Sequence, residues 1–333
     1  MSHPLMQQAL PFLEALGRDL ERRAFALPAH WDVDHLCYRV GSLSRYIELR
    51  EELRVSDILL TETPVNGRPI ACFQLRNPLF WREVRIDVIE LPAPKAGRPT
   101  PEGFEHIEIV ADQSFQEIQR ADLPFELSPK NFNAELKLEL GERNLKFHHL
   151  SLHSVVRMES HTRAAAALKN SRILEDFASF RPLVAGTFPL GLDTLTSDLD
   201  LLFVASDLDA LDLELRRRFA TCVSFRQQRL TVDELTTSIT NFVMDDVPFE
   251  IFAQNREPVL QRAYRHFLIE EKLLKYGGEK LRDRVVQARA RGLKTEPAFG
   301  EALGLQGDPY LELLQWQELS VGELRQRLER ALA

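Results

Sequence analysis

The stretch from Gly186 to Val204 places the strongest constraint on the fold, because it joins a turn of small residues to a short apolar strand that carries two acids. The run from Leu199 to Val204 is almost wholly apolar, which is typical of a buried strand. Asp198 and Asp200 are two positions apart, so a strand projects both carboxylates to the same side. Two such acids repel each other unless a cation lies between them, and hard oxygen ligands suit Mg²⁺ that also holds substrate phosphates.

Two neighbouring features extend this pattern. Gly186-Thr187 lies upstream across a turn, where a bare backbone and a hydroxyl group would come close to a phosphate. Glu250 lies in the run 248–252 between apolar residues and offers a third carboxylate from a later strand. The alternatives are a solvated end of a strand for the two aspartates and an outward-facing position on a half-exposed strand for Glu250.

Gly-Thr, followed after ten residues by Asp-x-Asp on an apolar strand, resembles the signature of the polymerase-β-type nucleotidyltransferase superfamily. The resemblance implies that Asp198, Asp200 and Glu250 hold Mg²⁺. It also implies that Gly186 and Thr187 cradle the phosphates of a nucleoside triphosphate, from which a nucleotidyl group passes to an unidentified small-molecule or protein acceptor.

The helices that the pattern predicts after residue 259 supply further polar side chains. Residues 165–315 resemble a bacterial nucleotidyltransferase-like family known mainly as a domain of unknown function. Polar residues on otherwise apolar helices, together with the serine before the first acid, are candidates for binding the nucleotide, and an exposed helix face is the alternative for the helical ones. These candidates are Ser197, Tyr264, Arg265, His266 and Lys294.

The composition limits the class of protein. A chain of 333 residues is long enough for two domains, each with its own core. Its 42 basic and 50 acidic residues give a net charge of −8 without a basic block, which disfavours long nucleic acid as a substrate. The three scattered cysteines suggest neither a disulfide framework nor a thiolate metal site, and no apolar run is long enough to cross a bilayer. We therefore expect a cytoplasmic location.

The first half of the chain shows one pattern twice. After an amphipathic helix over 5–25, the order strand, helix and three strands occurs once before the Pro-rich segment 92–101 and starts again at Gly103. The first copy comprises strand 31–40, helix 42–53 and strands 56–63, 68–75 and 84–91. The second comprises strand 103–110, helix 114–121 and strands 134–140 and 145–156, with no clear strand over 122–133.

A doubled βαβββ unit with a histidine on each first strand resembles the vicinal oxygen chelate superfamily of glyoxalase-like metal enzymes. The segments Asp34-His35, 90–94, 101–108 and 146–152 together resemble the YecM family over residues 10–158. The superfamily pattern implies a transition-metal site, Zn, Ni, Mn or Fe, with ligands His35, Glu90 and His106. Its fourth ligand falls on the last strand, where a carboxylate is usual and this sequence has His148 and His149 instead. Adjacent strand residues face opposite sides, so only one of the two can reach the metal, and we assign His149. Histidines hydrogen-bonded within the core are the alternative.

The second half begins with a helix over 162–177 and a strand over 181–185 before the Gly-Thr turn. A helix over 207–219, strands over 225–232, 237–244 and 247–252, and helices from 259 onward follow. The fold class predicted is α+β with two domains: a paired βαβββ vicinal-oxygen-chelate-like domain at 1–158, and a polymerase-β-type mixed sheet with C-terminal helices at 162–333.

Three functions fit these patterns. The first is a Mg²⁺-dependent nucleotidyltransferase fused to a metal-binding glyoxalase-like domain, and this is the one we favour. In the second, the first domain is a metal-dependent isomerase, lyase or dioxygenase, and the second domain binds nucleotides without turnover. In the third, both halves only bind ligands and regulate. Both superfamilies host many chemistries, so the resemblance to them does not distinguish among these functions. The sequence also leaves the oligomeric state open.

Overall fold

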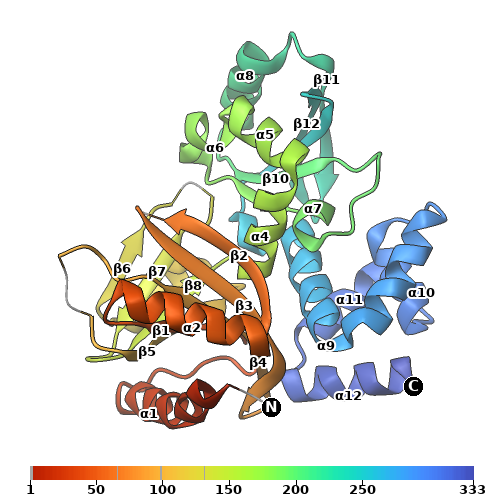
Figure 1. The fold of residues 1–333 in the computed structure, drawn as a ribbon. Coiled ribbons are helices and arrows are strands. Elements are labelled where there is room, and N and C mark those ends of the chain that lie inside the picture. Colours follow the sequence, from red (N-terminus) through yellow and green to blue (C-terminus); the bar gives the residue numbers. More distant parts are fainter. Residues whose placement is uncertain (1–2, 66, 98–99, 131) are drawn as a thin grey trace. The chain divides into compact units, whose positions relative to one another are not determined.

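The structure is a computed structural model that describes residues 3–65, 67–97, 100–130 and 132–333. The chain divides into two compact units (Figure 1). Unit 1 comprises Met1–Ala111, Phe115–Pro129 and Ala134–Leu152, and unit 2 comprises Asp112–Ser114, Lys130–Asn133 and His153–Ala333. The α+β, two-domain fold class is confirmed. Within the described residues, no helix has both the length and the apolar character needed to cross a membrane.

Unit 1 is built on one eight-stranded sheet in the order β2-β3-β4-β1-β5-β8-β7-β6. The first copy of the repeat contributes β1 (Asp32–Arg39), α2 (Leu43–Ser56), β2 (Ile58–Val65), β3 (Arg68–Trp81) and β4 (Val84–Pro92). The second contributes β5 (Gly103–Val110), α3 (Phe115–Ile118), β6 (Phe125–Ser128), β7 (Glu135–Glu139) and β8 (Asn144–His148). Antiparallel pairing of β1 with β5 joins the two copies at the centre of the sheet.

The strand register relates the two copies to each other. In the first copy, β1 pairs in parallel with β4, and Cys37 lies opposite Glu90. In the second, β5 pairs in parallel with β8, and Glu108 lies opposite Lys146. Since His35 and His106 precede Cys37 and Glu108 by two residues each, the position of Glu90 in the first copy corresponds to that of Lys146 in the second.

Helix α1 (Ala9–Arg22), preceded by the 3-10 helix η1 (Pro4–Gln8), buries one apolar face in the core of unit 1. Its spacing of leucines gives this amphipathic face, as the sequence predicts. The buried acid on the helix, Asp19, accepts a hydrogen bond from Arg143 at 2.6 Å and also pairs with Arg22. The Arg143 pair therefore ties the helix to the turn before β8.

Two predictions for unit 1 are wrong at the level of secondary structure. The segment 122–133, expected to lack a strand, contains the short edge strand β6, whose side chains are mostly exposed. The strand predicted over 145–156 ends at His148, and Leu152–Ser160 forms helix α4 instead. The amide of Leu152 donates to the carboxylate of Asp34 at 2.8 Å, so an acid distant in sequence satisfies the first turn of this helix.

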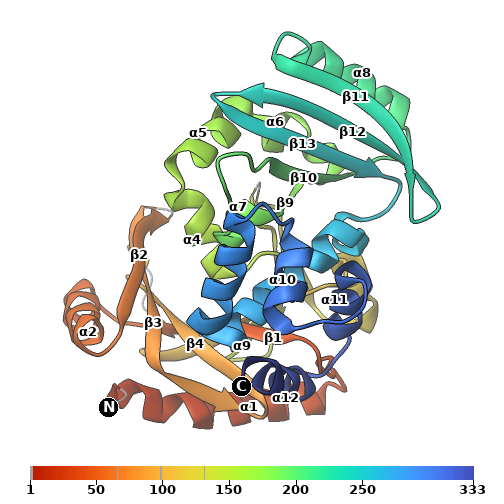
Figure 2. The ribbon, with the colours of Figure 1, turned by 90° about the vertical axis from the view of Figure 1, so that its right-hand side faces the viewer.

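Unit 2 contains a five-stranded sheet in the order β11-β12-β13-β10-β9 (Figure 2). The strands are β9 (Leu183–Ala185), β10 (Leu199–Val204), β11 (Val223–Val232), β12 (Leu235–Met244) and β13 (Val247–Gln254). Strand β10 pairs in parallel with β13 and antiparallel with β9. The sheet is therefore mixed, as predicted.

Helices cover this sheet and extend beyond it. They are α5 (Thr162–Ser171), α6 (Ile173–Asp176), α7 (Thr187–Leu190), α8 (Leu208–Phe219), α9 (Arg262–Ala290), α10 (Thr295–Leu303), α11 (Pro309–Gln317) and α12 (Val321–Leu332), with the 3-10 helices η2 (Gln119–Ala121) in unit 1 and η3 (Ala178–Phe180) and η4 (Pro258–Leu260) in unit 2. The single helix predicted over 162–177 is interrupted at Arg172, whose φ is 53°. The helices predicted from 259 onward begin with α9, which is kinked at Gly278, where φ is 60° and ψ is −159°.

We predict that Asp19→Asn lowers the free energy of unfolding by about 1–3 kcal/mol at neutral pH, because it removes a charge-assisted hydrogen bond to Arg143. The bond to Arg143 holds the pKa of Asp19 below its ordinary value. The contribution of this hydrogen bond to stability is therefore complete above the pKa of Asp19 in the unfolded chain, about 3.9, and is lost as the pH falls through the lower pKa of Asp19 in the folded protein. Thermal denaturation at pH 7 should separate the variant from the native chain, and the difference should shrink below pH 4. Glu14→Gln, an exposed change on the same helix, is the control, and an equal effect of both changes would contradict the prediction.

Candidate functional site

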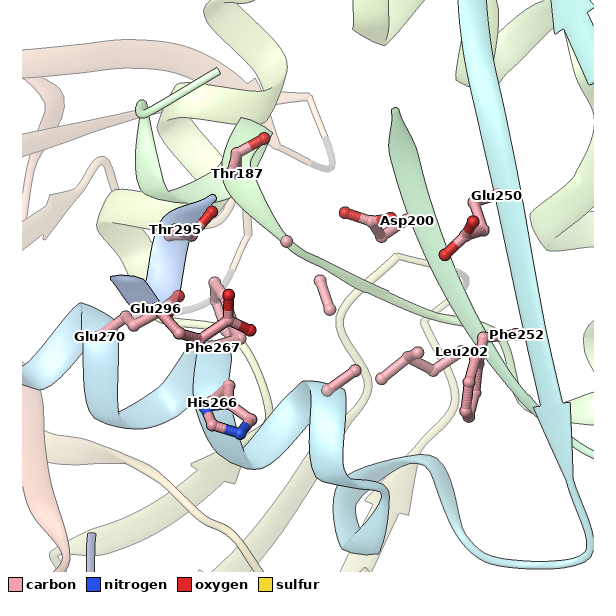
Figure 3. A pocket seen from close by; sticks show the side chains of 13 residues that line it. Thr187, Asp200, Leu202, Glu250, Phe252, His266, Phe267, Glu270, Thr295 and Glu296 are labelled. Carbon is pink, nitrogen blue, oxygen red and sulfur yellow. The ribbon is translucent and has the colours of Figure 1, made fainter. Parts of the chain in front are cut away.

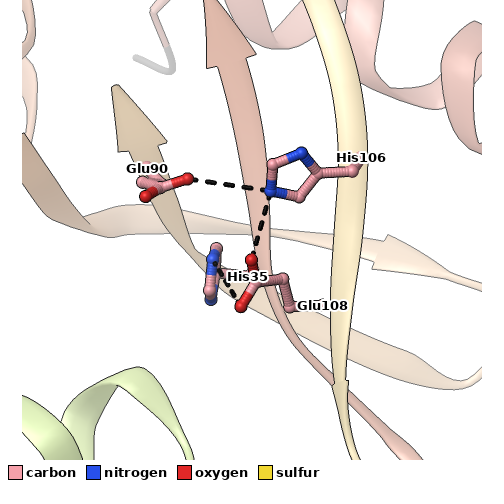
Figure 4. A group of neighbouring side chains, drawn as sticks. All are labelled: His35, Glu90, His106 and Glu108. Atoms are coloured by element: carbon pink, nitrogen blue, oxygen red, sulfur yellow. Dashed lines mark ion pairs between the residues drawn. The ribbon is translucent and has the colours of Figure 1, made fainter. Parts of the chain in front are cut away.

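Four side chains from the centre of the unit 1 sheet form a compact cluster (Figure 4). His35 comes from β1, Glu90 from β4, and His106 and Glu108 from β5, and their ligand atoms all lie within 4.8 Å of one another. The β1–β5 pairing brings the two histidines together, and alternation along β5 turns Glu108 to the same face as His106. The structure thus brings together three of the four residues that the sequence predicts as metal ligands, with Glu108 added.

The distances define which atoms face one another. His106 Nε2 lies 3.2 Å from Glu108 and 3.7 Å from Glu90, and His35 Nε2 lies 3.5 Å from Glu108. Each imidazole is held from behind, because Nδ1 of His35 is 2.9 Å from Asp34 and Nδ1 of His106 is 2.9 Å from Glu105. Carboxylates that fix one ring nitrogen in this way orient the other nitrogen toward a metal and raise its basicity. Within the part of the chain that the structure describes, no hydrogen-bond partner reaches His106 Nε2.

A second group continues this cluster along β8. Lys146 lies 3.3 Å from Glu108 and 3.2 Å from Glu135, and His148 Nε2 lies 2.9 Å from Glu108. Although burial opposes ionisation, His35 and His148 hold the pKa of Glu108 well below its ordinary value. Burial likewise opposes protonation of His148, but Glu108 raises the pKa of His148 to about 9.

The structure does not bring His149 into this cluster. Its ring stacks on Phe115 with centroids 4.2 Å apart, and its Nδ1 lies 3.1 Å from the carbonyl of Ala111. Its neighbour His148 faces Glu108 instead, because β8 alternates and directs Lys146 and His148 to one side. Because the two copies correspond, Lys146 occupies in the second copy the position that Glu90 has in the first. The second carboxylate of the cluster comes from Glu108 instead.

The second site lies in unit 2, where β10 and β13 run in parallel. Asp200 lies directly opposite Glu250 in the strand register, and both side chains line a pocket of about 200 Å³ (Figure 3). Burial and the nearby Glu250 and Asp198 raise the pKa of Asp200 well above its ordinary value. Burial and Glu250 also raise the pKa of Asp198. The three acids therefore repel one another, which favours a cation among them.

Gly186 contacts the same carboxylate group. A β-carbon built at this position would lie 1.7 Å from an oxygen of Asp200, so only glycine fits. Its φ of 74° and ψ of −153° belong to a region that glycine alone readily adopts. Thr187 also lines the pocket. Ser197 is buried and accepts hydrogen bonds from the amide of Thr194 and from Arg289, so it stabilises the turn before β10.

The predicted helical residues have different environments. His266 lines the pocket, but Tyr264 is fully buried and is not among its lining residues. Arg265 donates to Gln317 and Glu318, and Lys294 is exposed at the residue before α10. Of these four residues, the structure brings only His266 to the pocket.

Two of the acids that line the pocket were not among the site residues predicted from the sequence. Glu270 lies one helical turn after His266 on α9, and Glu296 lies in the first turn of α10. The spacing His-x₃-Glu was a usable signal for the first acid, since residues four apart share a helix face. Of the described residues that line the pocket, none is a lysine or an arginine.

The fold and the two clusters define a protein with two α+β units, each of which gathers acids and histidine on one face. Residues 3–140 match the family model described as YecM protein, and residues 166–316 match the one described as Domain of unknown function (DUF4269). The chain thus matches the YecM family model in its first half and the DUF4269 family model in its second, which confirms the predicted resemblance to the YecM family and to a family known as a domain of unknown function.

Two curated relatives match the first half. Protein YecM of Escherichia coli (strain K12) is 34% identical over 99 residues, which make up 30% of this chain and 52% of that protein. An uncharacterized protein of Haemophilus influenzae is 38% identical over 82 residues, or 25% of this chain and 43% of that protein. The chain therefore spans about half the length of the curated relatives it matches.

Solved structures match parts of the chain with low TM-scores. A structural-genomics structure, Protein EC4020, is 27% identical with a TM-score of 0.42 over 48% of this chain and 94% of that chain. Cid1, described with RNA terminal uridylyl transferase activity, is 18% identical with a TM-score of 0.30 over 38% of this chain and 40% of that chain. A glyoxalase I mutant from Zea mays is 12% identical with a TM-score of 0.27 over 67% of this chain and 70% of that chain.

We predict that Gly186→Ala destabilises unit 2 by about 3 kcal/mol or more, because it combines a glycine-only conformation with overlap against Asp200. Gly304→Ala is the matched control, since Gly304 also has a positive φ, 68°, but no atom within 4 Å of an added β-carbon. That variant should lose only about 1 kcal/mol. Thermal denaturation of both variants measures the difference, and equal losses would show that contact with Asp200 is unimportant.

Proposed function

We propose that unit 2 is a Mg²⁺-dependent nucleotidyltransferase that moves a nucleotidyl group from a nucleoside triphosphate to a small-molecule or protein acceptor. The observation that carries the proposal is the register of β10 with β13, in which Asp200 and Glu250 face one pocket beside the bare backbone of Gly186. Asp198, which lies two residues earlier and is not among the described residues that line the pocket, is the third acid of the proposed site.

The donor set fits the ion. Asp198, Asp200 and Glu250 would provide the hard oxygen ligands that Mg²⁺ prefers, and none of the described residues that line the pocket is a lysine or an arginine. The raised pKa of Asp200, caused by burial and by Glu250, indicates that ionised acids are costly here until a cation arrives. When bound, Mg²⁺ would neutralise charge on the phosphates and on the oxygens that enter and leave.

The protein residues would act mainly by positioning, as expected for phosphoryl-group chemistry. Asp198, Asp200 and Glu250 would hold the ion, while Asn241 orients Glu250 by donating to it at 3.1 Å. The absence of a side chain at Gly186 leaves room for the Asp200 carboxylate, and the hydroxyl of Thr187 would donate to a phosphate. In the reaction, an acceptor oxygen forms a bond to the α-phosphorus, the bond to pyrophosphate breaks, and the hydroxyl proton leaves to water.

A second candidate function belongs to unit 1, and a separate observation favours it. The cluster of His35, Glu90, His106 and Glu108 combines imidazole nitrogens with carboxylates, a donor set that suits Zn, Mn, Fe or Ni. We propose this cluster as a metal site that could polarise a substrate oxygen.

For unit 2, we predict that Asp200→Asn and Glu250→Gln each abolish Mg²⁺-dependent nucleotide binding and pyrophosphate release. Neither change should lower the thermal midpoint, because each removes repulsion between neighbouring, partly buried acids. Calorimetric titration of ATP, CTP, GTP and UTP with Mg²⁺, followed by a pyrophosphate assay, provides the measurement. Glu329→Gln, an exposed change on α12, serves as the control.

Full pyrophosphate release by a folded Asp200→Asn variant would exclude the assigned site. Absence of nucleotide binding in the native chain would favour the alternative in which unit 1 is the enzyme.

For unit 1, we predict that His106→Asn weakens transition-metal binding at least tenfold, whereas His149→Asn leaves it unchanged. The two variants change the same residue type, but only His106 lies in the cluster. Calorimetric titration of Zn²⁺ or Ni²⁺ into the chelator-treated protein compares them. An equal loss in both variants, or none in either, would remove the cluster as a metal site.

A further inference from the structure

The pocket of unit 2 has a second polar wall, formed by helices rather than strands. His266 and Glu270 lie one turn apart on α9, and Glu296 lies in the first turn of α10 (Figure 3). One ligand atom from each of these residues falls within 4.8 Å of the others. Asp200 and Glu250 do not belong to this group, so the pocket contains two separate collections of acids.

Among the residues that the structure describes, several donor and acceptor atoms on this wall have no hydrogen-bond partner. His266 is only 4% exposed, and neither of its ring nitrogens has a hydrogen bond. Glu270 is 3% exposed, and its Oε1 is also unpartnered. Buried polar atoms are normally satisfied, because leaving one without a partner costs free energy. Two adjacent residues with this property, both facing a pocket, indicate that a ligand completes them.

The charge of the group defines the ligand. Burial lowers the pKa of His266 to about 4, which leaves a neutral imidazole with a free lone pair. Burial and Glu296 raise the pKa of Glu270 well above its ordinary value, and burial raises that of Glu296. An imidazole and two carboxylates that crowd one another accept a cation far better than a hydrogen-bond donor of neutral charge.

We propose that His266, Glu270 and Glu296 bind one divalent transition-metal ion, separate from the Mg²⁺ assigned to Asp198, Asp200 and Glu250. An imidazole with carboxylates suits Mn²⁺, Fe²⁺, Co²⁺ or Zn²⁺, whereas Mg²⁺ prefers oxygen ligands alone. The spacing of His266 and Glu270 by one helical turn directs both side chains to the same point, and Glu296 closes the site from the next helix. The inference goes beyond nucleotide transfer and does not depend on it.

Cobalt is a suitable probe, because Co²⁺ bound to nitrogen and oxygen ligands has a visible absorption band. The full chain carrying His35→Asn and His106→Asn, which removes two ligands of the unit 1 cluster, would be stripped with a chelator and loaded with Co²⁺. Metal analysis after gel filtration and the absorption spectrum would then give the bound equivalents. In this background, His266→Asn or Glu270→Gln should remove about one equivalent and its absorption. Glu301→Gln, an exposed change on α10, should remove nothing.

Two further variants make the result decisive. Asp200→Asn should keep the cobalt, and loss of the same equivalent there would overturn a separate site. Thermal denaturation shows whether a change at the buried His266 or Glu270 prevents folding. If it does, Glu296→Gln, at a partly exposed position, provides the same measurement of bound cobalt. Unchanged cobalt in the folded His266→Asn and Glu296→Gln variants would also overturn the proposal. Cobalt bound here in a protein that transfers no nucleotide would contradict only the proposed function.

Discussion

Burial of like-charged carboxylates beside one another is the constraint on which both candidate sites depend. In unit 2, the parallel pairing of β10 with β13 fixes Asp200 opposite Glu250, and no side chain of opposite charge lines that pocket within the described residues. In unit 1, Lys146 and three histidines surround Glu108 and offset its burial. An uncompensated buried charge costs several kcal/mol or shifts its pKa until it becomes neutral. Unit 2 therefore needs an external cation more than unit 1 does.

Most of the fold could be predicted because its elements have clear periodicity. The apolar run in β10 and the alternation of apolar and polar residues in β5 predicted the first and last residues of these strands correctly. A strand with one buried face leaves little freedom of register. The errors arose where distant residues decide the local structure. Helix α4 starts where Asp34 accepts the amide of Leu152, and no local pattern contains that contact. Strand β6 is short and mostly exposed, so it lacks the apolar alternation that marks a strand.

The candidate sites could be predicted only in part. Repeat positions identified His35, Glu90 and His106, but the choice between His148 and His149 needed the orientation of β8. That information was present in the sequence, because buried Leu145 and Phe147 mark the core face and assign Lys146 and His148 to the other side. Glu108 follows by the same rule from His106. Neither inference could show that Lys146 would occupy the position that matches Glu90, because that result depends on the strand register.

The acids on the helical wall of the unit 2 pocket add to the negative charge of the acids on its strands. Asp200, Glu250, Glu270 and Glu296 together would carry four negative charges in a pocket of about 200 Å³. The proposed nucleoside triphosphate would add more negative charge, so it would enter only with cations that neutralise both the pocket and its phosphates. Since the raised pKa values of Asp200 and Glu270 each include repulsion from neighbouring acids, a cation on either wall lowers the cost of ionising the groups on its own side. Metal and nucleotide binding in this pocket are therefore expected to be thermodynamically linked, with each favouring the other by the same free energy.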